Sequence, residues 1–266
     1  MMDTLKYGLH ASRMLLKSHL QYPSSFIWHT IAMAVMTGGE FGAVLLLFGR
    51  FTSLGQWSSG EVVLFFGMIQ FSFSLVEWFA RGVSSFSVMV HTGWFDTVLL
   101  RPRGTFVQLL FGQMDPRRLG STLVGIAAIL MATRLTNLVW TWDKLLCLLI
   151  SLSGTFALFL GLFLIEAVVS LFSIKSIEMV NILTYGGRTT CQYPIDIYPK
   201  PMRFIFMIIA PIGLTLHLPA AYILNKAIWG EPSWLAFISP ISGFVALGLM
   251  LIIWQRGVRK YRSTGS

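Results

Sequence analysis

Long apolar runs separated by short charged segments make up most of this 266-residue sequence. A helix that crosses the hydrocarbon core of a bilayer needs about 20 mostly apolar residues. Six such windows, bounded by charges, Pro or Trp, lie at residues 24–48, 61–83, 119–140, 145–172, 202–224 and 234–254. The pattern predicts an all-α integral membrane protein with six transmembrane helices.

Two of these windows contain features that change the expected helix. In the third window Arg134 interrupts the apolar run, and we expect its side chain to snorkel toward the headgroups. The fifth window contains Pro211 and Pro219. Proline inside a helix leaves a backbone carbonyl without its partner and commonly kinks the helix. We therefore expect the fifth span to be broken.

The positions of Lys and Arg predict the orientation, because basic residues gather in cytoplasmic loops. With the N-terminus inside, sixteen basic residues fall on inner segments, and the four on outer segments are Arg50, Arg134, Lys144 and Lys226. We expect both termini in the cytoplasm and the protein in the plasma membrane. The long inner connections at 84–118 and 173–201 would then meet any cytoplasmic partner.

The residues before the first span predict an amphipathic helix. A stripe of leucines and a stripe of basic residues follow helical spacing on adjacent faces: Leu5, Leu9, Leu16 and Leu20 beside Lys6, His10, Arg13 and Lys17. Such a helix would lie in the headgroup layer, its cations near anionic lipid and its leucines in the acyl boundary. The alternative is a solvated N-terminal helix.

Composition narrows the classes of function. The chain is 55% hydrophobic and 12% charged, about half the charged fraction of a soluble domain. Its net charge of +9 comes from residues that interrupt apolar runs, so we expect membrane lipid and no nucleic acid as a partner. The sequence has no nucleotide-binding, hydrolase or metal-binding signature. We therefore predict no catalytic, cofactor or metal site on this chain, and any ATP must bind another chain.

The segment between the second and third spans is unusually apolar for a connection. Residues 92–104 read TGWFDTVLLRPRG. We expect Trp94, Phe95, Leu99 and Leu100 to form a hydrophobic knob on a short helix that ends before Pro102. Asp96 and Arg101 would lie at its polar edge. Interface hot spots favour aromatic residues and Arg, so the knob is typical of a protein-docking element. The alternative is packing against the inner membrane surface.

The run DTVLLRP after the second span, of the form DxxLLRP, resembles the permease family of type-two ABC exporters. A second block is similar to the same family: the Tyr-Pro entry at Tyr193, the mid-span Pro211, and a Pro-Ala pair at Pro219. The resemblance covers the whole chain in length, number of spans and amphipathic start. It implies two such permeases, identical or related, bound to two cytoplasmic ABC ATPase subunits that carry ATP and Mg²⁺ and drive export by alternating access.

The resemblance also implies roles for particular segments. The connection between spans two and three would be the coupling element that docks on the ATPase through Trp94, Phe95, Asp96, Leu99, Leu100 and Arg101. Pro211 and Pro219 would be gating kinks, and the outer end of span five up to Trp229 a re-entrant gate. The parts of one permease domain at 1–266 would be an elbow helix at 1–22, spans one and two at 24–83, the coupling segment at 84–118, spans three and four at 119–172, a cytoplasmic connection at 173–201, spans five and six at 202–255 and a basic tail at 256–266.

Ionisable residues within the spans are candidates for a translocation path or subunit interface, because each costs free energy at mid-bilayer unless paired or hydrated. These are Glu40, Glu166 and His217. Glu77 and Arg81, four residues apart, are expected to pair on one helix face. The few charges favour an amphipathic substrate such as a lipid, drug or peptide. A proton-coupled secondary transporter that uses Glu40, Glu166 and His217 is the alternative, and a membrane enzyme is a more distant one.

Overall fold

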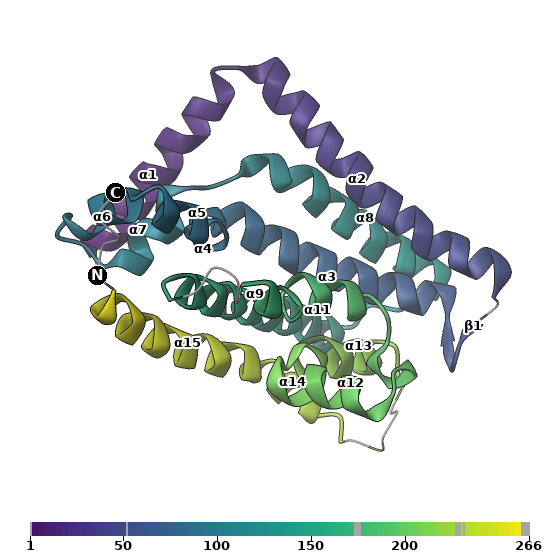
Figure 1. Ribbon diagram of the computed structural model, residues 1–266. Coiled ribbons are helices and arrows are strands. Elements are labelled where there is room, and N and C mark those ends of the chain that lie inside the picture. The colour runs from purple at the N-terminus through teal and green to yellow at the C-terminus, as the bar shows by residue number, and fades with distance from the viewer. Residues whose placement is uncertain (1, 52, 173–176, 227–229, 231, 262–266) are drawn as a thin grey trace.

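The computed structural model describes residues 2–51, 53–172, 177–226, 230 and 232–261, and its regular structure is almost entirely helical (Figure 1). The α-helices are α1 Met2–Leu20, α2 Pro23–Arg50, α3 Ser59–Phe79, α4 Arg81–Ser84, α5 Phe86–His91, α6 Trp94–Leu99, α7 Thr105–Gly112, α8 Leu119–Leu135, α9 Trp142–Ser170, α10 Ile177–Asn181, α11 Tyr185–Thr190, α12 Lys200–Phe204, α13 Leu218–Ile223, α14 Leu235–Ile238 and α15 Ile241–Lys260. Short 3₁₀ turns η1 Pro116–Arg118 and η2 Ile195–Ile197, and π-type turns η3 Ile205–Ile209 and η4 Gly213–His217, join them. A hairpin of β1 Ser53–Leu54 and β2 Trp57–Ser58 connects α2 to α3.

Five of these helices are long and apolar enough to cross a membrane, and a sixth span is added if the bent pair at 200–223 is counted. The prediction of an all-α membrane protein is confirmed. Helices α2, α3 and α9 begin and end within a few residues of the predicted windows. Helix α8 is shorter than predicted, because it ends at Leu135 and the chain then turns through Asn137, whose φ is +49°.

The bundle has two distinct ends. One carries the β1–β2 hairpin, and we call it the hairpin end. The other carries α4 to α7, and we call it the α6 end. The last residues of α8 meet the first turn of α3 at the hairpin end, where a Cβ on Gly60 would lie 2.7 Å from the Cβ of Leu135. The start of α1 and the end of α15 lie together at the α6 end (Figure 1).

The prediction of a cytoplasmic connection at 173–201 is wrong for its second half. Helix α10 packs against the final part of α9, whereas Asp196 of η2 accepts hydrogen bonds from Gln56 and Trp57 of the hairpin. The stretch from α10 to η2 therefore runs from the α6 end to the hairpin end, alongside α3. Residues 173–176 lie outside the described residues.

The fifth predicted span, 202–224, is accordingly not a crossing. Both of its ends lie near the hairpin: η2 precedes it, and after it Lys226 donates to the carbonyl of Gln56. Its two halves, Lys200–Ile209 and Gly213–Ile223, meet at 85°. The chain enters from the hairpin end, bends and returns, which makes 200–223 a re-entrant element.

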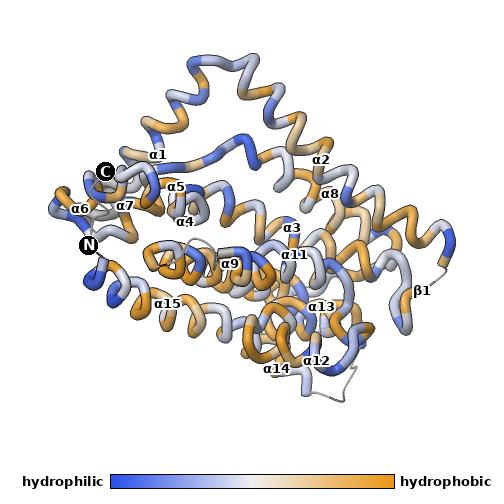
Figure 2. The backbone as a smooth tube through the Cα atoms, in the orientation of Figure 1, coloured by the Kyte–Doolittle hydropathy of each residue, from blue (hydrophilic) through white to orange (hydrophobic). Residues whose placement is uncertain are grey.

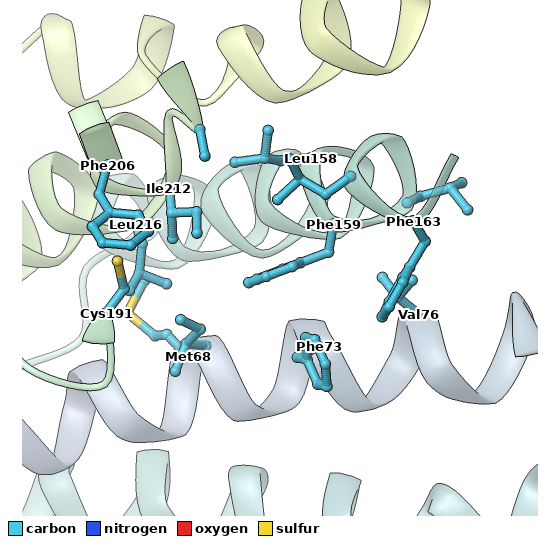
Figure 3. Packing of buried hydrophobic residues seen from close by; sticks show 14 of the residues in the cluster. Met68, Phe73, Val76, Leu158, Phe159, Phe163, Cys191, Phe206, Ile212 and Leu216 are labelled. Atoms are coloured by element: carbon cyan, nitrogen blue, oxygen red, sulfur yellow. The ribbon is translucent and has the colours of Figure 1, made fainter. Parts of the chain in front are cut away.

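Helix α3 occupies the centre of the bundle, with α8 on one side and α9 on the other. Phe73 of α3 makes an edge-to-face contact with Phe159 of α9 at 5.0 Å (Figure 3). Helices α3 and α8 approach so closely that a Cβ on Gly125 would lie 2.8 Å from the backbone nitrogen of Phe71. Small residues at such crossings let backbones touch, which is how membrane helices gain packing contacts.

The outer helices α2 and α15 keep apolar faces exposed on the isolated chain (Figure 2). Thr37 of α2 bonds Ser121 of α8 at 2.8 Å, so this face of α2 packs within the chain. The predicted small-residue motif of Gly38 and Gly42 lies on an open face, since a Cβ at either position meets nothing within 4 Å. This face is free for lipid or another chain.

The N-terminal segment forms the predicted helix, α1, which contacts α7 near its start and diverges from α2 (Figure 1). Leu16 and Leu20 are exposed. The side chains of Leu5, Lys6 and Leu9 lie outside the described part of the chain.

Candidate coupling site and polar groups of the spans

Helix α6 presents an apolar surface away from the bundle. Gly93, with a φ of +68°, turns the chain into the helix, and Trp94, Leu99 and Leu100 project outward, Leu100 with 85% of its surface exposed. Gly tolerates this left-handed conformation without the steric cost of a Cβ. We call Trp94, Leu99 and Leu100 the outer triad. Arg101 beside it is exposed.

Phe95 points the opposite way from the outer triad. Its ring is fully buried and lies 4.7 Å from the Phe86 ring, 6.3 Å from the Trp254 ring and 5.1 Å from the Tyr261 ring, centroid to centroid. The structure therefore places Phe95 inside the chain and away from the predicted docking surface. Asp96 is half-buried next to Tyr261, and burial followed by the charge of that carboxylate raises the pKa of the Tyr261 phenol.

The same aromatic cluster joins α6 to the last span. Trp254 belongs to α15, packs edge-to-face on Phe86 of α5, and donates its indole N–H to Thr105 of α7 at 3.3 Å. On the other side, the buried Gln108 amide donates to the carbonyls of Val98 and Arg103 and so holds the end of α6. A displacement of α6 must therefore move α7 and α15 with it, because these contacts leave little free volume between them.

Glu40, one of the predicted path residues, forms an ion pair with Arg188 of α11. Arg188 also donates to the amide oxygen of Gln70 in the middle of α3 and lies over the Phe73 ring, 5.2 Å from its centroid. These contacts offset the cost of a charge at this depth. The Glu40 side chain is 46% exposed, so the pair lies on the surface of the isolated chain.

The expected pair of Glu77 with Arg81 is replaced by another partner. Glu77 forms a 2.7 Å ion pair with Arg118, at the start of α8, and accepts a hydrogen bond from Tyr185. The α-helix α3 ends at Phe79, so Arg81 does not continue the helical face that carries Glu77. Sequence spacing could not reveal this pair, because the two residues are far apart in the chain.

Glu166 is buried in α9, and its Oε2 has no hydrogen-bond partner among the described residues. His217 lies elsewhere, at the hairpin end, where its Nδ1 accepts the backbone N–H of Ile195 at 3.2 Å and its ring packs between Trp57 and Phe65. Glu40, Glu166 and His217 therefore do not meet in a single relay, which removes the geometric support for a proton-coupled transporter.

The re-entrant element is fastened to the hairpin by polar contacts. Trp57 donates its indole N–H to Asp196 at 2.9 Å, and the Lys226 ammonium bonds Glu61 at 2.8 Å while lying 4.8 Å above the Trp57 ring. Glu61 also accepts the backbone N–H of Ser58 and caps α3. These contacts join the two sides of the re-entrant element to the start of α3.

The two predicted gating prolines have different positions. Pro211 lies in the 85° break between the two halves of the re-entrant element, as expected for a kink. Pro219 lies in the first turn of α13, where a missing N–H costs little. Pro219 therefore marks a helix start and no kink of its own.

A bundle of apolar spans with a bent re-entrant element and a short exposed helix at one end defines a multi-pass membrane transport subunit. The family described as "ABC-2 family transporter protein" matches residues 34–265, and the chain belongs to this family. It is an ABC transporter permease, and the permeases of this family are generally membrane subunits without enzymatic activity. No curated protein and no solved structure matches the chain.

Proposed function

We propose that this permease is the membrane-spanning subunit of an ATP-driven exporter and that α6 receives the movement of a separate cytoplasmic ATPase. The observation that carries the proposal is the outer triad: three large apolar side chains face outward from a helix that Phe95 and Val98 fix to the bundle. Buried aromatic anchors surrounded by polar groups are typical of interface hot spots. Arg101 and the exposed Arg103 supply that polar rim.

The proposed route of force runs from α6 through the aromatic cluster to α15. A permease can use ATP bound elsewhere when a rigid element transmits the partner's movement to the spans. Phe95 and Trp254 share one packed cluster, so a shift of α6 reaches the last span directly. In this proposal Asp96 and Phe95 position the docking helix, and the outer triad and Arg101 make the contact.

The partners follow from this role. Two ABC ATPase subunits with ATP and Mg²⁺ would dock at the α6 end, and a second permease, identical or related, would complete the path. The open face of α2, with Gly38 and Gly42, is a suitable surface for that second permease. We place the α6 end and both termini in the cytoplasm and the protein in the plasma membrane. The basic residues still favour this orientation after Lys200 and Arg203 move to the hairpin end.

The proposed substrate is amphipathic, such as a lipid, drug or peptide, and moves outward by alternating access. Most exposed side chains on the spans are apolar, and the Glu40–Arg188 pair is a polar exception at mid-depth. The re-entrant element would act as the outer gate, with its bend at Pro211. Glu166 and His217 are kept as candidates for the path and for support of the gate, respectively.

Copurification of the tagged chain from its native membrane tests the proposal. We expect the wild-type chain to recover an ABC ATPase. Leu100→Asp places a charge in the outer triad and should reduce the recovered ATPase at least tenfold, whereas Thr92→Asp, at an exposed polar position just before α6, should leave it unchanged. Recovery of no ATPase by the wild type, or equal recovery by both variants, would contradict the proposal.

A further inference from the structure

Two cavities flank the second half of α1, next to the turn η1. The larger, about 270 Å³, has an almost wholly apolar lining. It is formed by Leu16 of α1, Trp78 and Phe79 at the end of α3, and Met114 and Pro116 before α8, with Arg13 at its edge. Trp78 and Phe79 stack face to face, 5.0 Å apart between ring centroids. This stack makes a flat apolar wall of the kind against which a hydrocarbon chain packs.

The smaller cavity, about 130 Å³, is polar and basic. Ser18 and His19 of α1, His29 of α2 and Arg117 of η1 line it. Pro116 of the first cavity and Arg117 of the second are consecutive residues, so the two cavities adjoin across η1. An apolar pocket therefore opens beside a group of hydrogen-bond donors and cations.

The depth of this pair of cavities is that of the membrane interface. They lie where α3 ends at Phe79 and α8 begins at Leu119, which is the boundary between apolar spans and charged connections. Arg13 and Lys17 on α1 are exposed at the same level. Basic side chains at this depth attract anionic headgroups, at about 1 kcal/mol for each Lys or Arg.

Arg117 retains donors for a ligand. Its Nε and Nη2 donate to the two carboxylate oxygens of Asp115, at 2.6 and 3.2 Å. A guanidinium has five N–H donors in a planar fork, so the pair with Asp115 fixes its orientation and leaves further donors available. A phosphate is the anion whose geometry best matches such a fork.

We propose that one anionic glycerophospholipid binds at this place, with an acyl chain in the apolar cavity and its phosphate beside Arg13, His19 and Arg117. Six residues of α1 separate Arg13 from His19, a rise of about 9 Å, which the long Arg13 side chain can shorten. The lipid joins α1 to η1 and to the end of α3, next to the Glu77–Arg118 pair. It is a structural lipid, distinct from any transported substrate, and the inference does not depend on the proposed ATPase.

The test measures lipid bound to the purified chain by native mass spectrometry. Phosphatidylglycerol and phosphatidylcholine with the same acyl chains are added separately to the protein in a neutral detergent. We expect one tightly held phosphatidylglycerol per chain and weaker retention of phosphatidylcholine. Arg13→Gln should weaken phosphatidylglycerol binding about fivefold, the factor that corresponds to about 1 kcal/mol. Leu16→Trp, which fills the apolar cavity, should weaken binding of both lipids.

Lys17→Gln is the matched control, because it removes one exposed charge from the same helix at a position that lines neither cavity. It should retain phosphatidylglycerol like the wild type. An equal loss for Lys17→Gln and Arg13→Gln would show surface attraction without a site. Equal retention of the two lipids, or an unchanged result for Leu16→Trp in a chain with wild-type helix content, would also overturn the proposal.

Discussion

At the scale of single residues, the Glu77–Arg118 pair is the charge contact on which the packing of α3 against α8 depends most. The Glu77 side chain is 3% exposed. Removal of one partner of a buried pair leaves the other charge uncompensated and costs about 3 to 5 kcal/mol. We expect Glu77→Gln to lower the midpoint of thermal unfolding, measured in detergent micelles, by several degrees. The double variant with Arg118→Gln should recover part of that loss.

Glu40→Gln is the control for this prediction. It also removes a carboxylate that pairs with an arginine, but the Glu40 side chain is 46% exposed. Solvent screens an exposed pair, so the expected loss of stability is much smaller. An unfolding midpoint for Glu77→Gln equal to that of Glu40→Gln would mean that the Arg118 contact contributes little.

Asp115 carries a pH-dependent contribution outside the spans. Burial opposes its ionisation, but hydrogen bonds from Arg117 and the charges of Arg117, Arg118 and Arg81 outweigh burial and hold the pKa of Asp115 below its usual value of 3.8. A depressed folded-state pKa stabilises the protein above the unfolded-state pKa, and this stabilisation is lost as the pH falls through the folded-state value.

Asp115→Asn should therefore be less stable than the wild type at pH 7, by about 1 kcal/mol because Arg117 is partly exposed. The difference should persist down to about pH 4 and disappear only at lower pH. Unfolding of both proteins in denaturant across pH 3 to 7 measures it. A difference that grows as the pH falls would contradict the assigned sign.

At the scale of elements, the sequence predicted the long spans and the short docking helix, because both have strong local signals. Apolar length fixes α2, α3 and α9, and Gly93 and Pro102 bracket α6. The direction of each side chain on a six-residue helix has no such signal. Phe95 is inside because an aromatic cluster from α5 and α15 receives it, and that cluster is assembled only in the folded bundle.

The crossing formed by α10 to η2 could not be found by a search for apolar windows. Its helices are five and six residues long, and polar residues such as Thr184, Arg188 and Gln192 interrupt it. These polar groups are tolerated because protein surrounds them: Gln70 binds Arg188, for example. The re-entrant element has the opposite property. It is apolar enough to resemble a span, yet it returns to the end from which it entered.

The attachment of the re-entrant element to the hairpin gives a prediction at this scale. Trp57→Phe keeps an aromatic ring against Phe65 and His217 but removes the N–H donor to Asp196. Loss of a hydrogen bond to a charged group costs about 1.5 kcal/mol, which corresponds to about a tenfold change in a local opening equilibrium. Amide hydrogen exchange at 195–217 should therefore accelerate about tenfold.

Exchange in α15 should stay unchanged in that variant, because its contacts at the α6 end are intact. Trp142→Phe is the matched control, since that indole is 88% exposed. Faster exchange throughout the bundle would indicate general destabilisation, and unchanged exchange at 195–217 would show that the Trp57–Asp196 bond does not hold the element.

At the scale of the whole molecule, the two ends of the bundle differ in construction. The α6 end is an aromatic cluster that joins a docking helix to the first and last parts of the fold, and the hairpin end is a polar network that holds a bent element. Helix α3 is common to both, because Glu61 is at its start and Glu77 near its end. A movement applied at α6 can therefore reach the re-entrant element only through the spans, which is the coupling that an exporter with an outer gate requires.

The sidedness of this arrangement can be tested by labelling single cysteines in intact cells with a membrane-impermeant thiol reagent. The native Cys147 and Cys191 are buried, which keeps the background low. Gln56→Cys and Lys200→Cys, both at exposed positions of the hairpin end, should react from outside. Thr92→Cys at the α6 end should react only after permeabilisation. Lys200→Cys decides between the two topologies, because a cytoplasmic connection at 173–201 would make it behave like Thr92→Cys. Labelling of Lys200→Cys only after permeabilisation would contradict both the sixth crossing along α11 and the outer position of the re-entrant element.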